Sequence, residues 1–269
     1  MEHNGKYALI TGATSGIGYE LAKLFAQDGY HLVIVSRGEN GDLEKTASEL
    51  KSQYGVQVET LAKDLFKREE AFSVYDEVKA KGIQIDVLVN DAGQGQYGLF
   101  TDTDINRELD IVQLNIGSLI ILTKQFLKDM VARGEGKILN LSSVASKIPG
   151  PWQSVYHGTK AFVQSFTEAI RAENKDNAGI TITALLPGAT DTDFFAKADM
   201  EDSKIVQDKS KLASPADVAK DGYQALMRGD DKVVSGIKNK IQVAMAAVTP
   251  DSAVAEKIKK QQEPAGNNN

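Results

Sequence analysis

The sequence contains no cysteine, which excludes disulfide bonds, thiolate metal ligands and cysteine nucleophiles. It has only three histidines, His3, His31 and His157, and their spacing matches no usual metal-binding motif, so we expect no metal site. Basic residues number 31 against 37 acidic ones, giving a net charge of −6, and no basic block is present. This balance argues against a nucleic acid as the main partner.

Long apolar runs are also missing. The longest candidates, near residues 119–122 and 243–248, fall far short of the roughly 18 apolar residues that a membrane span needs. Near the N-terminus, the apolar run of residues 7–10 is interrupted by Thr11 and Gly12 and is too short for a signal peptide. We therefore expect no membrane attachment and a cytoplasmic location.

Short runs rich in β-formers alternate with segments of helical periodicity along most of the 269 residues. Continuous apolar runs of this length are typical of strands buried on both faces, and their alternation with helices predicts right-handed crossovers. The expected fold is α/β, a Rossmann-type doubly wound parallel sheet of about seven strands with helices on both faces. The first six strands are expected at residues 7–10, 31–35, 56–61, 85–89, 137–141 and 180–185.

Residues 1–236 are expected to form one domain, because neither a linker nor an internal repeat interrupts them. The charged segment at about 190–213 lies between a strand end and the helix-start signal Ser214-Pro215, where a lid over a site would belong. Residues 237–263 carry further helical stripes and read as a C-terminal helical extension of the same domain. The polar residues 264–269 are expected to be a disordered tail.

A glycine-rich turn from Thr11 to Gly18 joins the first strand to the following helix. Glycines at this point permit a tight turn, and the helix N-terminus directs amide N–H groups toward a bound pyrophosphate. The spacing is Gly-x3-Gly-x-Gly rather than the common Gly-x-Gly-x-x-Gly. A purely structural strand-to-helix turn is the alternative to a dinucleotide site.

Five further motifs follow in order, and with the glycine-rich turn they make the chain resemble the short-chain dehydrogenase/reductase family over about residues 6–235. The resemblance implies that residues 1–236 form a dinucleotide-binding and catalytic domain. The motifs are Asn90-Asp91-Ala92-Gly93, Asn115, Ser143, Tyr156-x3-Lys160, and Pro187-Gly188 with Thr192.

The Tyr156–Lys160 pair also makes physical sense. Residues four apart share a helix face, so the ammonium can lie near the phenol. Lowering a tyrosine pKa from about 10 to about 7 requires about 4 kcal/mol, and one charge at about 4 Å with an effective dielectric of about 20 supplies a term of that order. The alternative is an exposed pair on a solvated helix.

By resemblance, Tyr156 is the general acid in carbonyl reduction and the base in alcohol oxidation, while Ser143 orients the substrate oxygen. Lys160 would also hold the nicotinamide ribose, and Asn115 would kink its helix and help to hold a proton-relaying water. For Asn115, a buried amide satisfied by the backbone is the competing interpretation.

The expected cofactor is NADP(H), because Ser36 and Arg37 stand at the end of the second strand, where NAD-preferring relatives carry an acid. Ser15 occupies the place of an extra basic residue found in some NADP-binding relatives. Asp91 departs from the family, which usually has asparagine there. The expected cofactor-binding residues are Gly12, Thr14, Ser15, Gly16, Ile17, Gly18, Ser36, Arg37, Asp64, Leu65, Asn90, Ala92, Gly93, Tyr156, Lys160, Pro187, Gly188, Thr190 and Thr192.

The substrate pocket is expected to be mostly apolar and to accept a hydrophobic ketone or aldehyde. The alternative is that some of its aromatic residues only pack the lid against the sheet. The expected substrate-contacting residues are Gln94, Ala145, Trp152, Gln153, Phe194 and Phe195.

The predicted function is therefore reversible NADP(H)-dependent reduction of a ketone or aldehyde, with the proton supplied by Tyr156. Two alternatives remain open, a 3-oxoacyl thioester reductase and a non-catalytic NADP(H)-binding sensor or scaffold. From the habit of the family we expect a homo-oligomer, either a dimer or a tetramer.

The cofactor prediction is tested by comparing kcat/KM for NADPH and NADH. A charge-assisted contact of about 1.5–3 kcal/mol between Arg37 and the 2′-phosphate corresponds to a preference of about ten- to over a hundredfold for NADPH. Equal or better turnover with NADH would contradict it.

Overall fold

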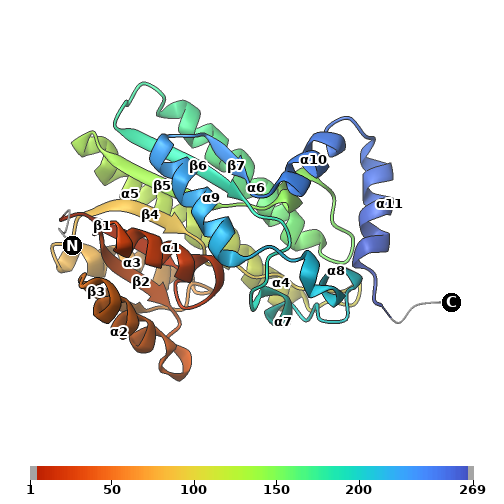
Figure 1. The fold of residues 1–269 in the computed structure, drawn as a ribbon, viewed down its shortest axis with the longest axis horizontal. Coiled ribbons are helices and arrows are strands. Elements are labelled where there is room, and N and C mark those ends of the chain that lie inside the picture. The colour runs from red at the N-terminus through yellow and green to blue at the C-terminus, as the bar shows by residue number, and fades with distance from the viewer. Residues whose placement is uncertain (1–4, 266–269) are drawn as a thin grey trace.

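The computed structural model describes residues 5–265 and contains one seven-stranded, all-parallel sheet (Figure 1). The strand order β3-β2-β1-β4-β5-β6-β7 reverses direction between β1 and β4, as a doubly wound sheet requires. This arrangement confirms the expected fold class. The strands are β1 (Tyr7–Thr11), β2 (His31–Ser36), β3 (Val58–Ala62), β4 (Ile85–Asn90), β5 (Gly136–Leu141), β6 (Ile180–Leu186) and β7 (Lys232–Val234).

Helices cover both faces of the sheet and bury two separate apolar clusters. One cluster lies beneath α1 (Gly16–Gln27), α2 (Asp42–Tyr54) and α9 (Pro215–Arg228). The other lies beneath α3 (Arg68–Ala80), α5 (Leu119–Arg133) and α6 (Ser154–Glu173). The sheet is therefore the middle layer of three.

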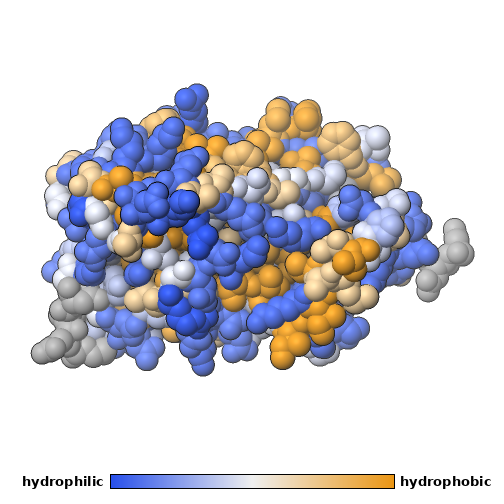
Figure 2. Space-filling model, turned by 90° about the horizontal axis from the view of Figure 1, so that it is seen from above, coloured by the Kyte–Doolittle hydropathy of each residue, from blue (hydrophilic) through white to orange (hydrophobic). Residues whose placement is uncertain are grey.

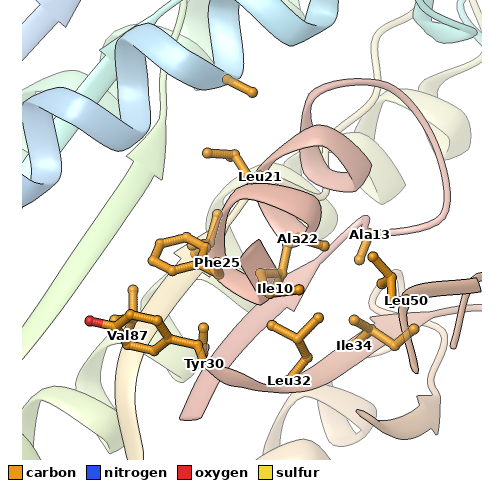
Figure 3. Close-up of a cluster of buried hydrophobic side chains, with 14 of the residues drawn as sticks. Ile10, Ala13, Leu21, Ala22, Phe25, Tyr30, Leu32, Ile34, Leu50 and Val87 are labelled. Atoms are coloured by element: carbon orange, nitrogen blue, oxygen red, sulfur yellow. The ribbon is translucent and has the colours of Figure 1, made fainter. Parts of the chain in front are cut away.

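Successive strand residues alternate between the two clusters, which explains why the strands read as continuous apolar runs. In β1, Ile10 points into the first cluster and Leu9 into the second. In the first cluster, Leu21 and Phe25 of α1 pack together with Ile10 of β1 and Leu32 of β2 (Figure 3). Because successive side chains of a strand point to opposite faces of the sheet, each strand makes apolar contacts with both helical layers.

Between β4 and β5 the chain forms α4 (Ile105–Val112), a π-helical turn (Gln113–Ser118) and then α5. A π-helical turn inserts an extra residue into the hydrogen-bonded ladder and re-aims the side chains within it. Asn115 lies in this turn, so the helix irregularity expected at that residue is present.

The expected lid segment contains α7 (Phe194–Lys197), α8 (Lys204–Gln207) and a short 3-10 helix (Lys209–Lys211). A parallel bridge between Thr190 and Ala213 joins the two ends of the segment. Two further 3-10 helices, Glu39–Gly41 and Val144–Lys147, follow β2 and β5.

The C-terminal extension consists of α10 (Ile237–Ala246) and α11 (Asp251–Gln262), which lie at the right-hand end of the molecule (Figure 1). Larger apolar areas of the surface gather toward the same end (Figure 2). Of the expected disordered tail, Pro264 pairs with Ser203, and the Ala265 N–H donates to the Asp202 carbonyl oxygen at 2.9 Å. Residues 266–269 lie outside the described residues. Within 5–265, every helix is too short or too polar to pass through a bilayer.

Replacing Phe25 by alanine tests the packing of the first cluster. The ring is fully buried, and its centroid lies 5.4 Å from that of Tyr30 and 4.9 Å from that of Tyr223 on α9. The resulting cavity should lower the free energy of unfolding by about 3–5 kcal/mol in urea denaturation. Phe100→Ala, at a side chain that is 63% exposed, serves as the control. Equal losses in the two variants would show that the cluster is not the stabilising core.

Candidate active site

A cavity of ≈ 840 Å³ lies at the edge of the sheet where the carboxyl ends of the strands meet. Its walls come from the segments after β1, β2, β3, β4, β5 and β6, from the start of α6, and from the lid and the C-terminal extension. Ligands of open α/β sheets bind at this edge, near the point where the strand order reverses.

The glycine-rich turn lies in the cavity wall and has the shape of an anion cradle. Gly12 and Gly16 have φ angles of +73° and +58°, a region in which residues with a side chain are strained. A Cβ atom on Gly16 would lie 3.0 Å from Cγ2 of Thr192 on the facing wall. The Ser15 side chain makes no capping hydrogen bond to the first turn of α1. The turn therefore fits a pyrophosphate held by a helix N-terminus.

Asp91 lies behind this turn. It accepts a hydrogen bond from the backbone N–H of Gly18, and a Cβ atom on Gly18 would lie 2.5 Å from Asp91 Oδ2. Gly18 thus packs against the loop after β4 and does not line the cavity, and its expected contact with the cofactor stays a prediction. Burial raises the pKa of the Asp91 carboxyl to about 7, although the charges of Lys160 and Lys197 oppose the rise.

Asn90 does not line the cavity either, and its expected cofactor contact stays a prediction. Its Nδ2 donates to Thr123 Oγ1 at 3.0 Å and to Asn140 Oδ1 at 2.8 Å, so the side chain joins β4 to β5 and α5. Thr11 Oγ1 accepts the backbone N–H of Ala92 at 3.0 Å. The end of β1 is therefore fixed to the loop after β4.

Ser143 and Tyr156 share the cavity wall and are hydrogen-bonded to each other. The Ser143 hydroxyl also accepts the Ala145 N–H at 3.1 Å and donates to the Pro187 carbonyl oxygen at 3.3 Å. The latter bond is long and can be exchanged for a bond to a ligand oxygen by rotation of the hydroxyl.

Lys160 lies one turn after Tyr156 on α6, and its Nζ donates to the Leu141 carbonyl oxygen at 2.8 Å. The Nζ atom is 5.8 Å from the centroid of the Tyr156 ring. Burial lowers the pKa of Lys160 to about 8, and the nearby carboxyl of Asp91 opposes this change. The expected sharing of one helix face by the two side chains is present.

The pKa of Tyr156 differs from the sequence-based prediction. Burial raises it to about 12, and only the hydrogen bond with Ser143 acts in the opposite direction. The estimate of about 4 kcal/mol from one charge omitted the cost of removing a phenolate from water, which dominates in this wall. Lys160 also directs its ammonium to the β5 carbonyl instead of to the phenol oxygen.

The Asn115 side chain is buried and fully engaged. Its Oδ1 accepts the Gln94 N–H at 3.0 Å, and its Nδ2 donates to the Gln94 carbonyl oxygen and to Thr159 Oγ1, both at 2.9 Å. It does not line the cavity. These bonds match the alternative interpretation, a buried amide satisfied mainly by the backbone, and the relay role stays a prediction.

At the opposite end of the cavity, Arg37 forms an ion pair with Glu39 at 3.2 Å, and its guanidinium lies 5.9 Å from the centroid of the Phe66 ring. Asp64 Oδ1 accepts the Phe66 N–H at 3.2 Å, so the carboxylate fixes the turn before α3 rather than capping the helix itself. Sequence analysis missed Phe66, because only the folded chain brings it beside Arg37.

The Phe194 ring centroid lies 4.9 Å from that of Tyr156, so the lid contributes an aromatic wall beside the phenol. Gln94 also lines the cavity, and its Oε1 accepts a hydrogen bond from Arg107. Trp152 does not line the cavity, and its expected substrate contact stays a prediction. Its ring stacks on Tyr97 at 5.4 Å instead.

The remaining expected site residues reach the same cavity. The C-terminal extension also contributes to the wall, which the sequence did not indicate. The residues that it supplies are Ile237, Lys238, Asn239, Gln242, Ile258, Gln261 and Gln262. The helical stripes of the extension indicated helices but not the surface that they cover. The cofactor- and substrate-directed residues that line the cavity are Gly12, Thr14, Ser15, Gly16, Ile17, Ser36, Arg37, Asp64, Leu65, Ala92, Gly93, Gln94, Ala145, Gln153, Tyr156, Lys160, Pro187, Gly188, Thr190, Thr192, Phe194 and Phe195.

Comparison with known proteins agrees with this geometry. The family model for short chain dehydrogenases matches residues 6–203. A very-long-chain 3-oxoacyl-CoA reductase of Anas platyrhynchos is 35% identical over 189 residues, which cover 68% of this chain and 59% of that protein. The dehydrogenase/reductase SDR family member 7B of Danio rerio is 32% identical over 258 residues, which cover 93% of this chain and 80% of that protein.

Among solved structures, a short-chain dehydrogenase of Sphingobium yanoikuyae in complex with NADPH superposes with a TM-score of 0.78 at 27% identity, covering 91% of this chain and 96% of that chain. The L-sorbose reductase of Gluconobacter frateurii, complexed with NADPH and L-sorbose, gives a TM-score of 0.76 at 26% identity, with coverage of 88% and 98%.

The chain belongs to the short-chain dehydrogenase family, which confirms the family expected from the sequence. The match to the 3-oxoacyl-CoA reductase of Anas platyrhynchos spans only about three fifths of that longer protein.

Replacing Asp91 by asparagine tests the buried carboxyl. Folding raises the pKa of this carboxyl from 3.8 to about 7. Between these two pH values the folded protein therefore binds a proton that the unfolded chain does not, and the stability contributed by the carboxyl falls as the pH rises from 3.8 to about 7. The free energy of unfolding of Asp91→Asn, relative to the original protein, should therefore increase by on the order of 2 kcal/mol from about pH 5 to about pH 7.5. Urea denaturation at the two pH values measures it, and a difference that stays constant or shrinks would contradict the burial of this carboxyl.

Proposed function

We propose that the protein is an NADP(H)-dependent reductase of hydrophobic ketones or aldehydes. The observation that carries the proposal is the convergence of Ser143, Tyr156 and Lys160 on the same cavity as the glycine-rich turn. A dinucleotide held at the turn and a carbonyl held at Tyr156 would occupy two ends of one continuous space.

The residues of the cavity support NADP(H) as the cofactor, and when bound it supplies the hydride. The turn after β1 would hold the pyrophosphate, and Arg37 would meet the 2′-phosphate beyond the end of β2. Arg37 is now paired with the exposed Glu39, and this contact is weak enough to exchange. The NADPH complexes of two similar structures support the same choice.

Tyr156 would donate the proton to the carbonyl oxygen. Its raised pKa keeps the phenol protonated throughout the neutral range, which supports reduction as the direction favoured by the residues of the site. Ser143 would exchange its bond to the Pro187 carbonyl oxygen for one to the substrate oxygen. The Lys160 ammonium would stabilise the phenolate that proton transfer leaves behind.

A 3-oxoacyl thioester is the second candidate substrate. The similarity to very-long-chain 3-oxoacyl-CoA reductases favours it, as does a wall that includes Phe194, Phe195, Met200 and Ile258. Such a substrate is a ketone with an apolar chain, so it uses the same proton donor. The cytoplasmic location and the homo-oligomer stay predictions.

Replacing Tyr156 by phenylalanine tests the proposal and separates an enzyme from a non-catalytic sensor. Removing the proton donor should lower kcat for NADPH-dependent ketone reduction at least about a hundredfold, because positioned acid–base groups contribute about 10²–10⁴. The Kd for NADPH, followed by the fluorescence of the nicotinamide, should change little. Unchanged turnover would refute the role of Tyr156, and no turnover by the original protein on any ketone would favour the sensor.

A further inference from the structure

Three polar side chains outside the Ser143–Tyr156–Lys160 set are buried in the wall of the cavity. Gln153 and His157 come from the start of α6, and Gln262 comes from the end of α11. Their residues are only 5%, 6% and 5% exposed. Polar groups as buried as these normally find hydrogen-bond partners, so each free atom among them calls for an explanation.

The hydrogen bonds of this cluster fix the direction of each amide. His157 Nδ1 lies 2.9 Å from the Ile148 carbonyl oxygen and must therefore donate to it. Burial lowers the pKa of His157, so the ring is neutral and its Nε2 is an acceptor. Gln262 Nε2 lies 3.4 Å from this Nε2 and 3.4 Å from Gln153 Oε1, and it serves as the donor to both.

This assignment leaves one donor and one acceptor unused. Gln153 Nε2 and Gln262 Oε1 are buried and have no hydrogen-bond partner among residues 5–265. Gln153 Nε2 lies 3.5 Å from the point that a Cβ atom on Gly95 would occupy, and that point is 3.4 Å from Cδ2 of Tyr156. The unused donor is therefore beside the ring of the proposed proton donor.

The main chain of Gln262 is held firmly in this position. Tyr97 and Ser203 both donate hydroxyl hydrogen bonds to its carbonyl oxygen, the latter at 3.0 Å. These bonds join the loop after β4, the lid and the C-terminal extension at one point. The end of α11 is therefore built into the wall, where its side chain reaches the interior.

We propose that Gln153 and Gln262 form a polar subsite that binds an uncharged secondary amide or hydroxyl group next to the carbonyl that is reduced. On entering, such a group would turn the two buried amide side chains toward the cavity, accept a hydrogen bond from Gln153 Nε2 and donate one to Gln262 Oε1. A carboxylate is excluded, because one of its two negatively charged oxygens would lie against Gln262 Oε1, and neither of these oxygens can donate a hydrogen bond. This inference rests on the proposed function and narrows its substrate class.

Three substrates of similar length test the subsite. N-hexylacetoacetamide offers an acceptor and a donor, hexyl acetoacetate offers only an acceptor, and an aliphatic methyl ketone offers neither. The original protein should have kcat/KM about tenfold higher for the amide than for the ester, because a site built for an N–H rejects the analogue that lacks it. No preference between amide and ester would overturn the proposal without any variant being needed.

The Gln262→Met variant should reduce the amide-to-ester ratio to about one by removing the acceptor. Glu256→Met, at an exposed position on the same helix, is the matched control and should leave the ratio at about ten. Circular dichroism and the Kd for NADPH report whether each variant is folded. An unchanged ratio in folded Gln262→Met would overturn the assignment of Gln262.

The same measurements distinguish a failure of the proposed function from a failure of the proposed subsite. If the original protein reduces none of the three compounds, carbonyl reduction is refuted for aliphatic ketones of this kind. In that case, calorimetric binding of the amide to the protein with NADPH tests the subsite alone. A Kd for the amide raised about tenfold by Gln262→Met would support the subsite. An equal Kd for the two proteins, or no binding of the amide to the original protein, would overturn it.

Discussion

The buried ammonium of Lys160 is the constraint on which the site depends. It donates to the end of β5, faces the Tyr156 ring at 5.8 Å and interacts with the charge of Asp91 after β4. A buried cation is tolerated only where such partners compensate the loss of hydration. The two strand ends and α6 must therefore keep their relative positions for Lys160 to remain charged, and this requirement links the architecture of the sheet to its chemistry.

Most of the fold and the central part of the site could be predicted from the sequence. The six expected strands all occur, because each is a short apolar run bounded by polar or glycine residues, a local pattern. The glycine-rich turn, Ser143, Tyr156 and Lys160 follow strand ends or begin helices, so knowledge of the sheet brings them to one edge. Local patterns of this kind therefore predict both the elements of the sheet and the edge at which these side chains meet.

What the sequence could not predict depends on contacts between distant segments. The ring of Trp152 stacks on that of Tyr97. Gln262 of the last helix contacts Gln153, which lies more than a hundred residues earlier in the chain. The pKa of Tyr156 was also beyond sequence arguments, because desolvation is a property of the completed wall. Packing determines both how exposed a side chain is and how much free energy its charged form costs.

We infer that the phenol of Tyr156 stays protonated in the cofactor-free protein, because burial opposes its ionisation. The positive charge of an oxidised nicotinamide held beside the phenol would favour the phenolate and lower the pKa. An ultraviolet difference titration of tyrosine ionisation, taken between the original protein and Tyr156→Phe, measures this directly with and without NADP⁺. The account predicts no ionisation of Tyr156 below about pH 10 in the free protein and a clear downward shift with NADP⁺. Ionisation near pH 7 in the free protein, or no shift with NADP⁺, would contradict it.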